Sequence, residues 1–247
     1  HLIISLDFSQ IELRVGAFYC RDEVMMETYR TGGDIHAATT AVVFGCTQEE
    51  AKDKHRDGYK EQRTIAKNIN FGTFYGLFPR GLQKTLKFKA GVEKTEEECA
   101  LMLENLKAGY PMLVRWQEET KLEARRRKYT ESWVGRRRYL PEIDSDDWGR
   151  KSFAERCALN TPIQGTAADM LKLAIARILS GLPERPWLRP ILQIHDELVF
   201  IIQSEKLQEA IGFIKACMEE KPFPEFDLPL VAEASYGTDF GNMEEME

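Results

Sequence analysis

Residues 191–202 read ILQIHDELVFII, two apolar runs on either side of His195, Asp196 and Glu197. Short apolar runs that flank a polar turn are typical of a strand, a turn and a second strand. The chain opens with another such run, at residues 2–6, which predicts a buried strand that ends at Asp7. We therefore expect strands from both ends of the chain, with acidic residues where those strands end.

Between these strands, residues 22–128 predict an almost wholly helical region that glycines divide into short helices. Residues 30–130 then form an insertion into the part of the chain that builds the sheet. The pattern further predicts a hairpin or extended loop at 130–140, a long helix at 149–181 that is interrupted near Pro162, a helix at 205–219 and a strand at 229–236. The predicted fold class is α+β, an antiparallel sheet with an inserted, mainly helical subdomain.

The composition is ordinary for a soluble globular protein, with 43% hydrophobic and 30% charged residues among 247. No apolar run approaches the roughly 20 residues that a membrane span needs. Five cysteines stand far apart, and none forms a Cys-x-x-Cys pair. This usage favours a reducing, intracellular location over a disulfide framework or a zinc site. Because a strand follows directly after His1, which is not an initiator, we expect a fragment of a longer protein.

The net charge of −6 by itself argues weakly against nucleic acid as a partner, because phosphate binding needs positive charge. Basic residues nevertheless cluster at 125–128 and again at 136–138. Each cluster is either a contact to nucleic acid or a solvated surface, and charge alone leaves both interpretations open.

Asp7 and Asp196 each follow an apolar run and therefore lie at the rim of the predicted sheet. If their strands are neighbours, the two carboxylates converge, and converging carboxylates repel unless a cation lies between them. Magnesium commonly takes one or two carboxylates plus substrate phosphates. Two such ions can activate an attacking oxygen and stabilise a leaving one in phosphoryl transfer. The alternative is that each aspartate only caps a turn.

Residues 63–76, RTIAKNINFGTFYG, carry Arg63, Lys67, Phe71 and Tyr75 at intervals of four. With about 3.6 residues per turn, these side chains share one face of a helix. The basic end of that face suits a triphosphate, and the aromatic end suits a sugar and a base. The alternative is an amphipathic helix with its aromatic residues in the core and its cations in water.

Several segments together resemble the motifs of family A DNA polymerases, the group of bacterial DNA polymerase I. Residues 7–14 resemble the first palm motif, residues 63–76 the fingers-helix motif and residues 193–200 the third motif, in the family's order. Three further segments are similar to the family: residues 34–36, 135–137 and 160–169. The resemblance covers nearly the whole chain.

The resemblance implies a site for two Mg²⁺ ions, held by Asp7, Asp196 and the backbone carbonyl of Phe8, where the family usually has tyrosine. By resemblance, Glu197 is a companion acid that supports the metal site. The resemblance also assigns the incoming triphosphate to His36, Arg63 and Lys67. Lys67 is implied as the proton donor to the departing pyrophosphate, and Thr64 stands where the family often has a second arginine.

The remaining implied contacts concern the sugar, the bases and the DNA. By resemblance, Phe71 lies under the nucleotide sugar, Tyr75 lies near the templating base, and Glu12 crowds the sugar 2′ position beside Gln10. The residues that resemble primer–template contacts are Arg156, Asn160, Gln164 and His195. Such minor-groove contacts report pair geometry more than base identity, which suits an enzyme that copies any sequence.

The resemblance implies a palm at residues 1–29 and 131–247 and fingers at residues 30–130, with the thumb and the exonuclease region absent from this chain. The implied function is the catalytic core of a template-directed DNA polymerase, which extends a primer 3′ end by two-metal-ion phosphoryl transfer. Its implied partners are primer–template DNA, deoxynucleoside triphosphates and the missing thumb or N-terminal part of the same polymerase, with no membrane. Two alternatives are a two-metal nuclease, which would not need the helix at 63–75, and a non-catalytic, DNA-binding polymerase relic.

Overall fold

The computed structural model describes residues 1–246. Their contacts divide the chain into two units, one formed by His1–Arg14 with Thr166–Glu247 and the other by Val15–Gly165. The first unit holds the larger antiparallel sheet, and the second is mainly helical. The expected α+β class, with a helical insertion between sheet-forming segments, is therefore confirmed.

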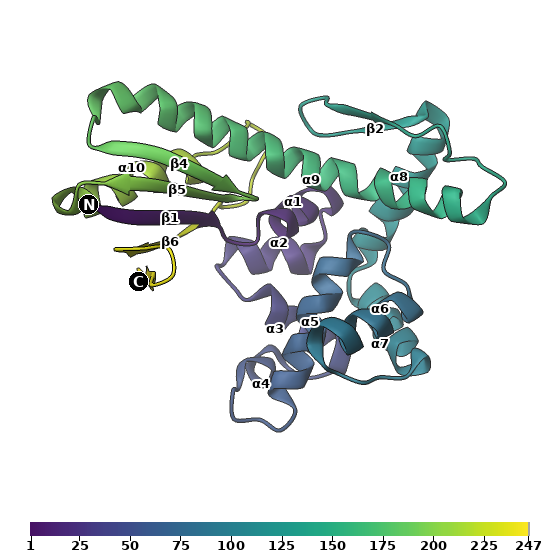
Figure 1. Ribbon diagram of the computed structural model, residues 1–247. Helices are drawn as coiled ribbons and strands as arrows, with labels where there is room; N and C mark the ends of the chain where they lie inside the picture. The colour runs from purple at the N-terminus through teal and green to yellow at the C-terminus, as the bar shows by residue number, and fades with distance from the viewer. Residues whose placement is uncertain (247) are drawn as a thin grey trace. The chain divides into compact units, whose positions relative to one another are not determined.

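The sheet of the first unit has five strands in the order β4-β5-β1-β6-β7. Figure 1 labels the first four of them. Strand β1 pairs antiparallel with β5 on one side and with β6 on the other, so both ends of the chain build it, as expected. The strands are β1 (Leu2–Phe8), β4 (Leu188–Ile194), β5 (Glu197–Ile202), β6 (Ala232–Gly237) and β7 (Glu244–Glu245).

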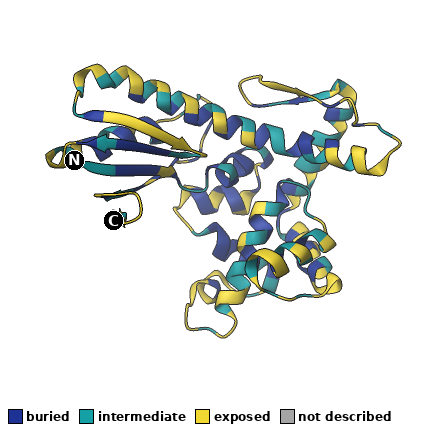
Figure 2. Ribbon diagram, viewed as in Figure 1, coloured by how far each residue is buried: buried dark blue, intermediate teal, exposed yellow. Residues whose placement is uncertain are grey.

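Burial along β1 explains why this strand occupies the middle of the sheet. Ile4, Leu6 and Phe8 alternate on one face and are at most 2% exposed. Ser5, on the opposite face, is also buried, whereas Asp7 is exposed at the end of the strand. Figure 2 shows the same contrast at the level of strands, with β1 largely buried and the edge strand β4 largely exposed.

Helix α10 (Leu207–Glu219) follows a short 3-10 turn, η3 (Ser204–Lys206), and contacts β1 and β6. Its last carbonyl groups lack partners within the helix, as at every helix C-terminus. The guanidinium of Arg177 donates to the carbonyl oxygen of Cys217 in the last turn and to those of Glu220 and Lys221 just after the helix, at 2.9–3.3 Å. Arg177 thereby ties α10 to the last part of α9 (Trp148–Gly181) within the first unit.

The second unit is built from short helices, in agreement with the helical pattern of the sequence. Helix α3 contacts α4, α5 and α7, and it forms the middle of the unit. The elements are α1 (Ile11–Cys20, which begins in the first unit), α2 (Glu23–Arg30), α3 (Ile35–Phe44), α4 (Gln48–Lys52), α5 (Tyr59–Thr73), α6 (Pro79–Thr85), the π-helical turn η1 (Leu86–Ala90), α7 (Glu96–Gly109), α8 (Pro111–Arg127) and the hairpin strands β2 (Tyr129–Glu131) and β3 (Arg137–Tyr139).

The expected interruption of helix α9 (Trp148–Gly181) near Pro162 is wrong, because the helix runs unbroken for 34 residues. A proline inside a helix cannot donate to the carbonyl four residues earlier, here that of Ala158. The hydroxyl of Thr130 in the hairpin donates to this carbonyl oxygen at 3.1 Å. A side chain from a distant segment thus satisfies the buried group that Pro162 leaves open. The short turn η2 (Leu182–Glu184) follows the helix.

No helix within residues 1–246 is both long enough and apolar enough to cross a membrane.

Two glycines of the first unit should respond in opposite ways to alanine. In Gly237→Ala, the new Cβ would lie 2.4 Å from the backbone oxygen of Asn242, so we expect a loss of stability of more than about 1 kcal/mol. In Gly212→Ala, within α10, the new Cβ meets nothing within 4 Å. There the lower entropy of the unfolded chain should add roughly 0.5–1 kcal/mol. Urea unfolding of both variants measures the difference, and a loss in both would contradict the open space at Gly212.

Candidate active site

The first unit concentrates acidic side chains around Asp7. In the antiparallel register, Asp7 on β1 lies opposite Glu197 on β5 and opposite Glu233 on β6. Side chains of directly opposite residues point to the same face of a sheet, and like charges in such pairs are destabilising. Asp7 therefore has an acidic neighbour on each side.

Asp196 joins this cluster because a tight turn connects β4 to β5. Strand β4 ends at Ile194 and β5 begins at Glu197, which leaves His195 and Asp196 as the two connecting residues. His195 has a φ of 55°, the left-handed conformation that tight hairpin turns require. The strand–turn–strand prediction for residues 191–202 is confirmed, and the turn presents Asp196 at the end of the hairpin.

The electrostatics of the cluster is visible in the pKa of Asp7. Although the residue is exposed, its carboxylate is partly shielded from water. This burial, followed by repulsion from Asp196 and Glu197, raises the pKa of Asp7 to about 6, against the lowering effect of the Phe8 backbone N–H. The Ser5 hydroxyl, on the same face, donates to the Glu197 carboxylate. A cation among these groups would relieve the repulsion.

The residues present fit magnesium under one condition. Residues 1–246 contain no group of three or more His, Cys, Asp or Glu side chains arranged to hold a metal ion. Magnesium, however, is often held by one or two carboxylates and completed by water and substrate phosphates. The Asp7–Asp196 pair fits such an ion if substrate oxygens complete its coordination.

The turn between β1 and α1 carries the other predicted residues of the first unit. Gln10 has a φ of 57°, and Glu12 lies in the first turn of α1, half-buried. Arg14 anchors this turn, since its guanidinium donates to the carbonyl oxygens of Ser9 at 2.9 Å and Pro229 at 2.8 Å. The first unit therefore brings together Asp7, Phe8, Gln10, Glu12, His195, Asp196 and Glu197.

In the second unit, α5 carries three of the four residues predicted to share its outer face, and all three are at least partly exposed. Lys67 and Phe71 are exposed, Phe71 by 53%, and Arg63 is half-buried. The expectation that Tyr75 lies on the same helix is wrong, because α5 ends at Thr73. The backbone N–H of Tyr75 donates to the Gly72 carbonyl at 3.0 Å, so Tyr75 lies in the turn that follows the helix.

Asp34 organises the residues beside α5. Its carboxylate accepts from the backbone N–H groups of His36 and Ala37, at 2.9 and 3.2 Å, and so caps the N-terminus of α3. It also pairs with the Arg63 guanidinium at 2.6 Å. Burial alone would raise the pKa of this carboxyl, but the Arg63 hydrogen bond and the backbone donors outweigh it and hold the pKa below its usual value.

His36 follows Asp34 and is only 6% exposed. Its burial, together with the charges of Arg63 and Lys67, lowers the pKa of the imidazole to about 4 in spite of the opposing Asp34 carboxylate. The ring centroids of His36 and Phe71 are 6.3 Å apart. The second unit thus brings together His36, Arg63, Lys67 and Phe71 around a neutral imidazole.

The predicted DNA contacts of the second unit share one face of α9. Arg156, Asn160 and Gln164 are spaced by four residues, and each is at least partly exposed. The Arg156 guanidinium donates to the Ser152 hydroxyl at 2.7 Å. The Asn160 side-chain oxygen is buried and has no hydrogen-bond partner within residues 1–246.

Sequence reasoning missed two groups that the structure adds to these sites. Glu233 becomes a neighbour of Asp7 through the β1–β6 register, and Asn70 contacts the His36 ring from the buried side of α5. The alternation of Ala232, Glu233 and Ala234 predicts an outward-facing Glu233, but only the register shows which residue it faces.

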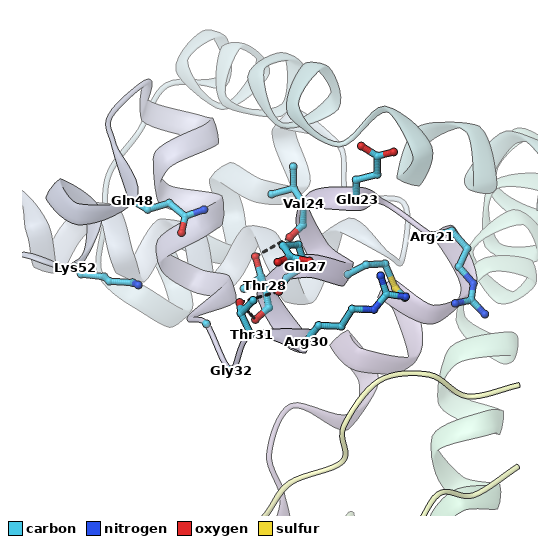
Figure 3. A pocket seen from close by; sticks show the side chains of 12 residues that line it. Arg21, Glu23, Val24, Glu27, Thr28, Arg30, Thr31, Gly32, Gln48 and Lys52 are labelled. Atoms are coloured by element: carbon cyan, nitrogen blue, oxygen red, sulfur yellow. Dashed lines mark hydrogen bonds between the residues drawn. The ribbon is translucent and has the colours of Figure 1, made fainter. Parts of the chain in front are cut away.

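A cavity of about 900 Å³ in the second unit contains none of the predicted site residues (Figure 3). It is lined by residues of α2 and α4 and of the turns that follow α1 and α2. Its charged side chains are Arg21, Arg30 and Lys52 against Glu23 and Glu27. This mixture of signs favours neither an anion nor a cation, so the cavity is not a second candidate site.

Comparisons with known proteins agree on one family. The model of the family described as DNA polymerase family A matches residues 1–242. DNA polymerase I of Pseudomonas aeruginosa is 36% identical over 239 residues, which cover 96% of this chain and 24% of that protein. The thermostable DNA polymerase I of Thermus aquaticus is also 36% identical over 239 residues, which cover 97% of this chain and 27% of that protein.

A solved structure is similar as well. The POL domain of Pol1 from M. smegmatis, in complex with DNA primer-template and dNTP, has a TM-score of 0.84 and 31% sequence identity. The similarity covers 96% of this chain and 40% of that one. The chain spans about a quarter of the length of the two curated relatives.

The acidic cluster should cost stability when no cation is present. We expect Asp7→Asn to raise the Tm of the protein in a chelating buffer at pH 8. Folding raises the pKa of Asp7 from its ordinary 3.8 to about 6, so the ionised carboxylate destabilises the folded state above that pH. The gain should shrink as the pH falls through 6 toward 4, where the parent carboxyl is also neutral. Glu225→Gln, at an exposed acid of the same unit, is the control and should change little. An equal gain at both ends of this pH range would contradict the electrostatic origin.

Proposed function

The chain belongs to DNA polymerase family A, and on that premise we propose that it carries the nucleotidyl-transfer site of a template-directed DNA polymerase. The observation that carries this proposal is the outer face of α5. It presents Arg63, Lys67 and an exposed Phe71 beside the neutral His36, which suits a triphosphate followed by a sugar. A two-metal nuclease would need the carboxylates but not this face.

The proposed substrates are deoxynucleoside triphosphates and primer–template DNA. In support, the M. smegmatis structure contains a DNA primer-template and dNTP. Arg63, Lys67 and His36 would hold the triphosphate, Phe71 would lie under the sugar, and Tyr75 near the templating base. The contacts proposed for primer and template are Arg156, Asn160, Gln164 and His195.

In the proposed reaction, the primer 3′-hydroxyl gives up its proton to water and its oxygen bonds to the α-phosphorus, while the bond from the α-phosphorus to the oxygen that bridges to the β-phosphate breaks. Lys67 gives a proton to the departing pyrophosphate, while Arg63 and His36 hold its charge. Two Mg²⁺ ions held by Asp7, Asp196 and the Phe8 carbonyl, with Glu197 in support, would supply Lewis-acid chemistry at the attacking and leaving oxygens. Positioning and electrostatics account for most of the catalysis in such transfers.

The subdomain roles belong to the same proposal. Residues 1–29 and 131–247 would serve as palm and residues 30–130 as fingers, with a thumb supplied by the rest of the polymerase. The relatives, of which this chain matches about a quarter, support a larger protein as its context. Their identity as bacterial DNA polymerase I also supports the proposed intracellular location.

Loss of either proposed metal-binding carboxylate should abolish primer extension. We expect Asp7→Ala and Asp196→Ala in the full-length protein to lose at least about a hundredfold in kcat, because each change removes a charge that the transferring phosphates depend on. Primer-extension assays in Mg²⁺ measure this, with Glu225→Ala as a control for an exposed acid outside the cluster. Primer–template affinity should change little. Near-parental turnover by either variant would sink the proposal, and degradation of the primer without extension by the parent would favour a nuclease.

Glu12 should select against ribonucleotides. A ribonucleotide would bring a 2′-hydroxyl against the Glu12 side chain, which must move aside or leave that hydroxyl unpaired, at a cost of roughly 1–3 kcal/mol. Glu12→Ala should therefore raise ribonucleotide insertion relative to deoxynucleotide insertion by roughly tenfold or more, even if total activity falls.

Single-nucleotide insertion kinetics with matched ribo- and deoxynucleotides test this expectation. Glu12→Gln keeps the size of the side chain and removes its charge, so it should retain most of the discrimination. An unchanged ratio of the two insertion efficiencies in Glu12→Ala would remove Glu12 from sugar selection and leave it to Phe71 and its neighbours.

A further inference from the structure

We infer that Asn70 is a positioning residue for His36: it binds Nδ1 of the imidazole and thereby presents Nε2 as an N–H donor to the nucleotide phosphates. The inference rests on the proposed nucleotide-binding role of His36. It adds a residue on the buried side of α5 to a site that is otherwise formed by His36 of α3 and the outer side of α5.

The geometry is a chain of buried hydrogen bonds across three helices of the second unit. The Asn70 amide contacts His36 Nδ1 at 2.9 Å, and the Thr39 hydroxyl donates to the Asn70 side-chain oxygen at 2.8 Å. The Thr39 hydroxyl also lies 2.9 Å from the Tyr110 hydroxyl. All four residues are at most 6% exposed, so water does not compete for these bonds. This series of hydrogen bonds runs from Tyr110, just before α8, to Thr39 on α3, then to Asn70 on α5 and finally to His36 on α3.

Burial fixes the direction of this chain. The Tyr110 hydroxyl is fully buried, and burial raises the pKa of its phenol, so it keeps its proton. Within residues 1–246 its hydrogen-bond partner is the Thr39 hydroxyl, whose oxygen must therefore accept a hydrogen bond from the Tyr110 hydroxyl. The Thr39 hydroxyl then donates its own hydrogen bond to the Asn70 side-chain oxygen, and the NH₂ group of Asn70 faces His36. Because this NH₂ group is a donor, His36 Nδ1 must be the acceptor and carries no hydrogen.

The other ring nitrogen points the opposite way. Nε2 takes part in none of the hydrogen bonds of residues 1–246, and it is not one of the buried side-chain atoms without a partner. It therefore reaches the accessible side of the ring. In a neutral imidazole with Nδ1 as acceptor, the proton resides on Nε2. Phosphate oxygens only accept hydrogen bonds, so this tautomer suits a triphosphate and the other would set a lone pair against it.

The charges around the ring keep it neutral, so its tautomer decides whether Nε2 can donate a hydrogen bond to a phosphate. The ionised groups that face His36 are Asp34 at the start of α3 and Arg63 and Lys67 on α5. Burial and the two cations lower the pKa of His36 to about 4, so the ring is neutral at physiological pH. A doubly protonated ring would donate from Nε2 in any case. A neutral ring does so only in its Nε2–H tautomer, and a donor to Nδ1 such as Asn70 holds the ring in that tautomer.

The first test is the tautomer itself. Two-bond ¹H–¹⁵N spectra of the ¹⁵N-histidine-labelled protein distinguish a protonated from an unprotonated ring nitrogen. His36 is assigned among the four histidines of the chain by the signal lost in His36→Gln. We expect the Nε2–H tautomer from pH 8 down to about 6. An Nδ1–H tautomer in the parent protein would show that the Asn70 amide is turned round and would overturn the inference.

Asn70→Asp keeps the shape of the side chain and replaces the donor with an acceptor. His36 should then carry a proton on Nδ1, and its pKa should rise. Asn68→Asp is the matched control, because Asn68 lies on the same helix but donates to the Thr64 carbonyl at 2.8 Å. In that control the tautomer should not change. Thr39→Val, which frees the Asn70 amide to rotate, should give a mixture of the two tautomers and serves if Asn70→Asp does not fold.

The second test is nucleotide binding by the full-length polymerase. At pH 8, Asn70→Asp should raise the KM for the deoxynucleoside triphosphate by roughly tenfold, with a smaller change in kcat. As the pH falls toward 6, the variant ring becomes doubly protonated and regains its Nε2 donor, so KM should recover toward the parental value. A merely structural defect would not recover with pH, and a KM that stays high would overturn the inference. A parent that shows the expected tautomer but no change at Nε2 on addition of the nucleotide would instead overturn the proposed role of His36.

Discussion

The register of β1 between β5 and β6 is the constraint on which the candidate site depends. Ile4, Leu6 and Phe8 fill one face of the strand, and Ser5 and Asp7 lie on the other. A slip by one residue would exchange the two faces, remove three side chains from the apolar core and carry Asp7 into it. The burial of the apolar face therefore fixes where the carboxylate emerges, and it sets Asp7 opposite Glu197 and Glu233.

This arrangement is unfavourable by the ordinary rules of sheet stability. Acidic residues stand opposite one another, and the pKa of Asp7 is raised first by burial and then by repulsion from Asp196 and Glu197. Proteins depart from local rules of this kind mainly at functional sites. A ligand that carries positive charge into the cluster removes the conflict, which is why the same residues that weaken the sheet fit a cation held jointly with substrate phosphates.

The sequence predicted the elements of this fold better than their partners. Apolar periodicity identified the strands at residues 2–6 and 191–202 and the helical region, because those signals are local. It failed at Pro162, where the hydroxyl that satisfies Ala158 comes from Thr130 on the hairpin. The acidic neighbour at Glu233 was missed for the same reason. Both depend on contacts between segments far apart in the chain, which no single stretch of residues records.

Helix α5 shows how a site can be recognised from an inverted pattern. On an ordinary amphipathic helix, Phe71 would lie in the core and Asn70 in water. The structure has the opposite, since Phe71 is 53% exposed and Asn70 is 2% exposed. Exposing a large aromatic ring and burying an amide are each unfavourable without compensation. Asn70 is compensated by Thr39 and His36, while Phe71 remains open beside Lys67. The spacing of four predicted a nucleotide-binding face with Arg63, Lys67 and Phe71. The buried Asn70 on the same helix supports that prediction, because it holds the imidazole of His36 that the proposed site would use.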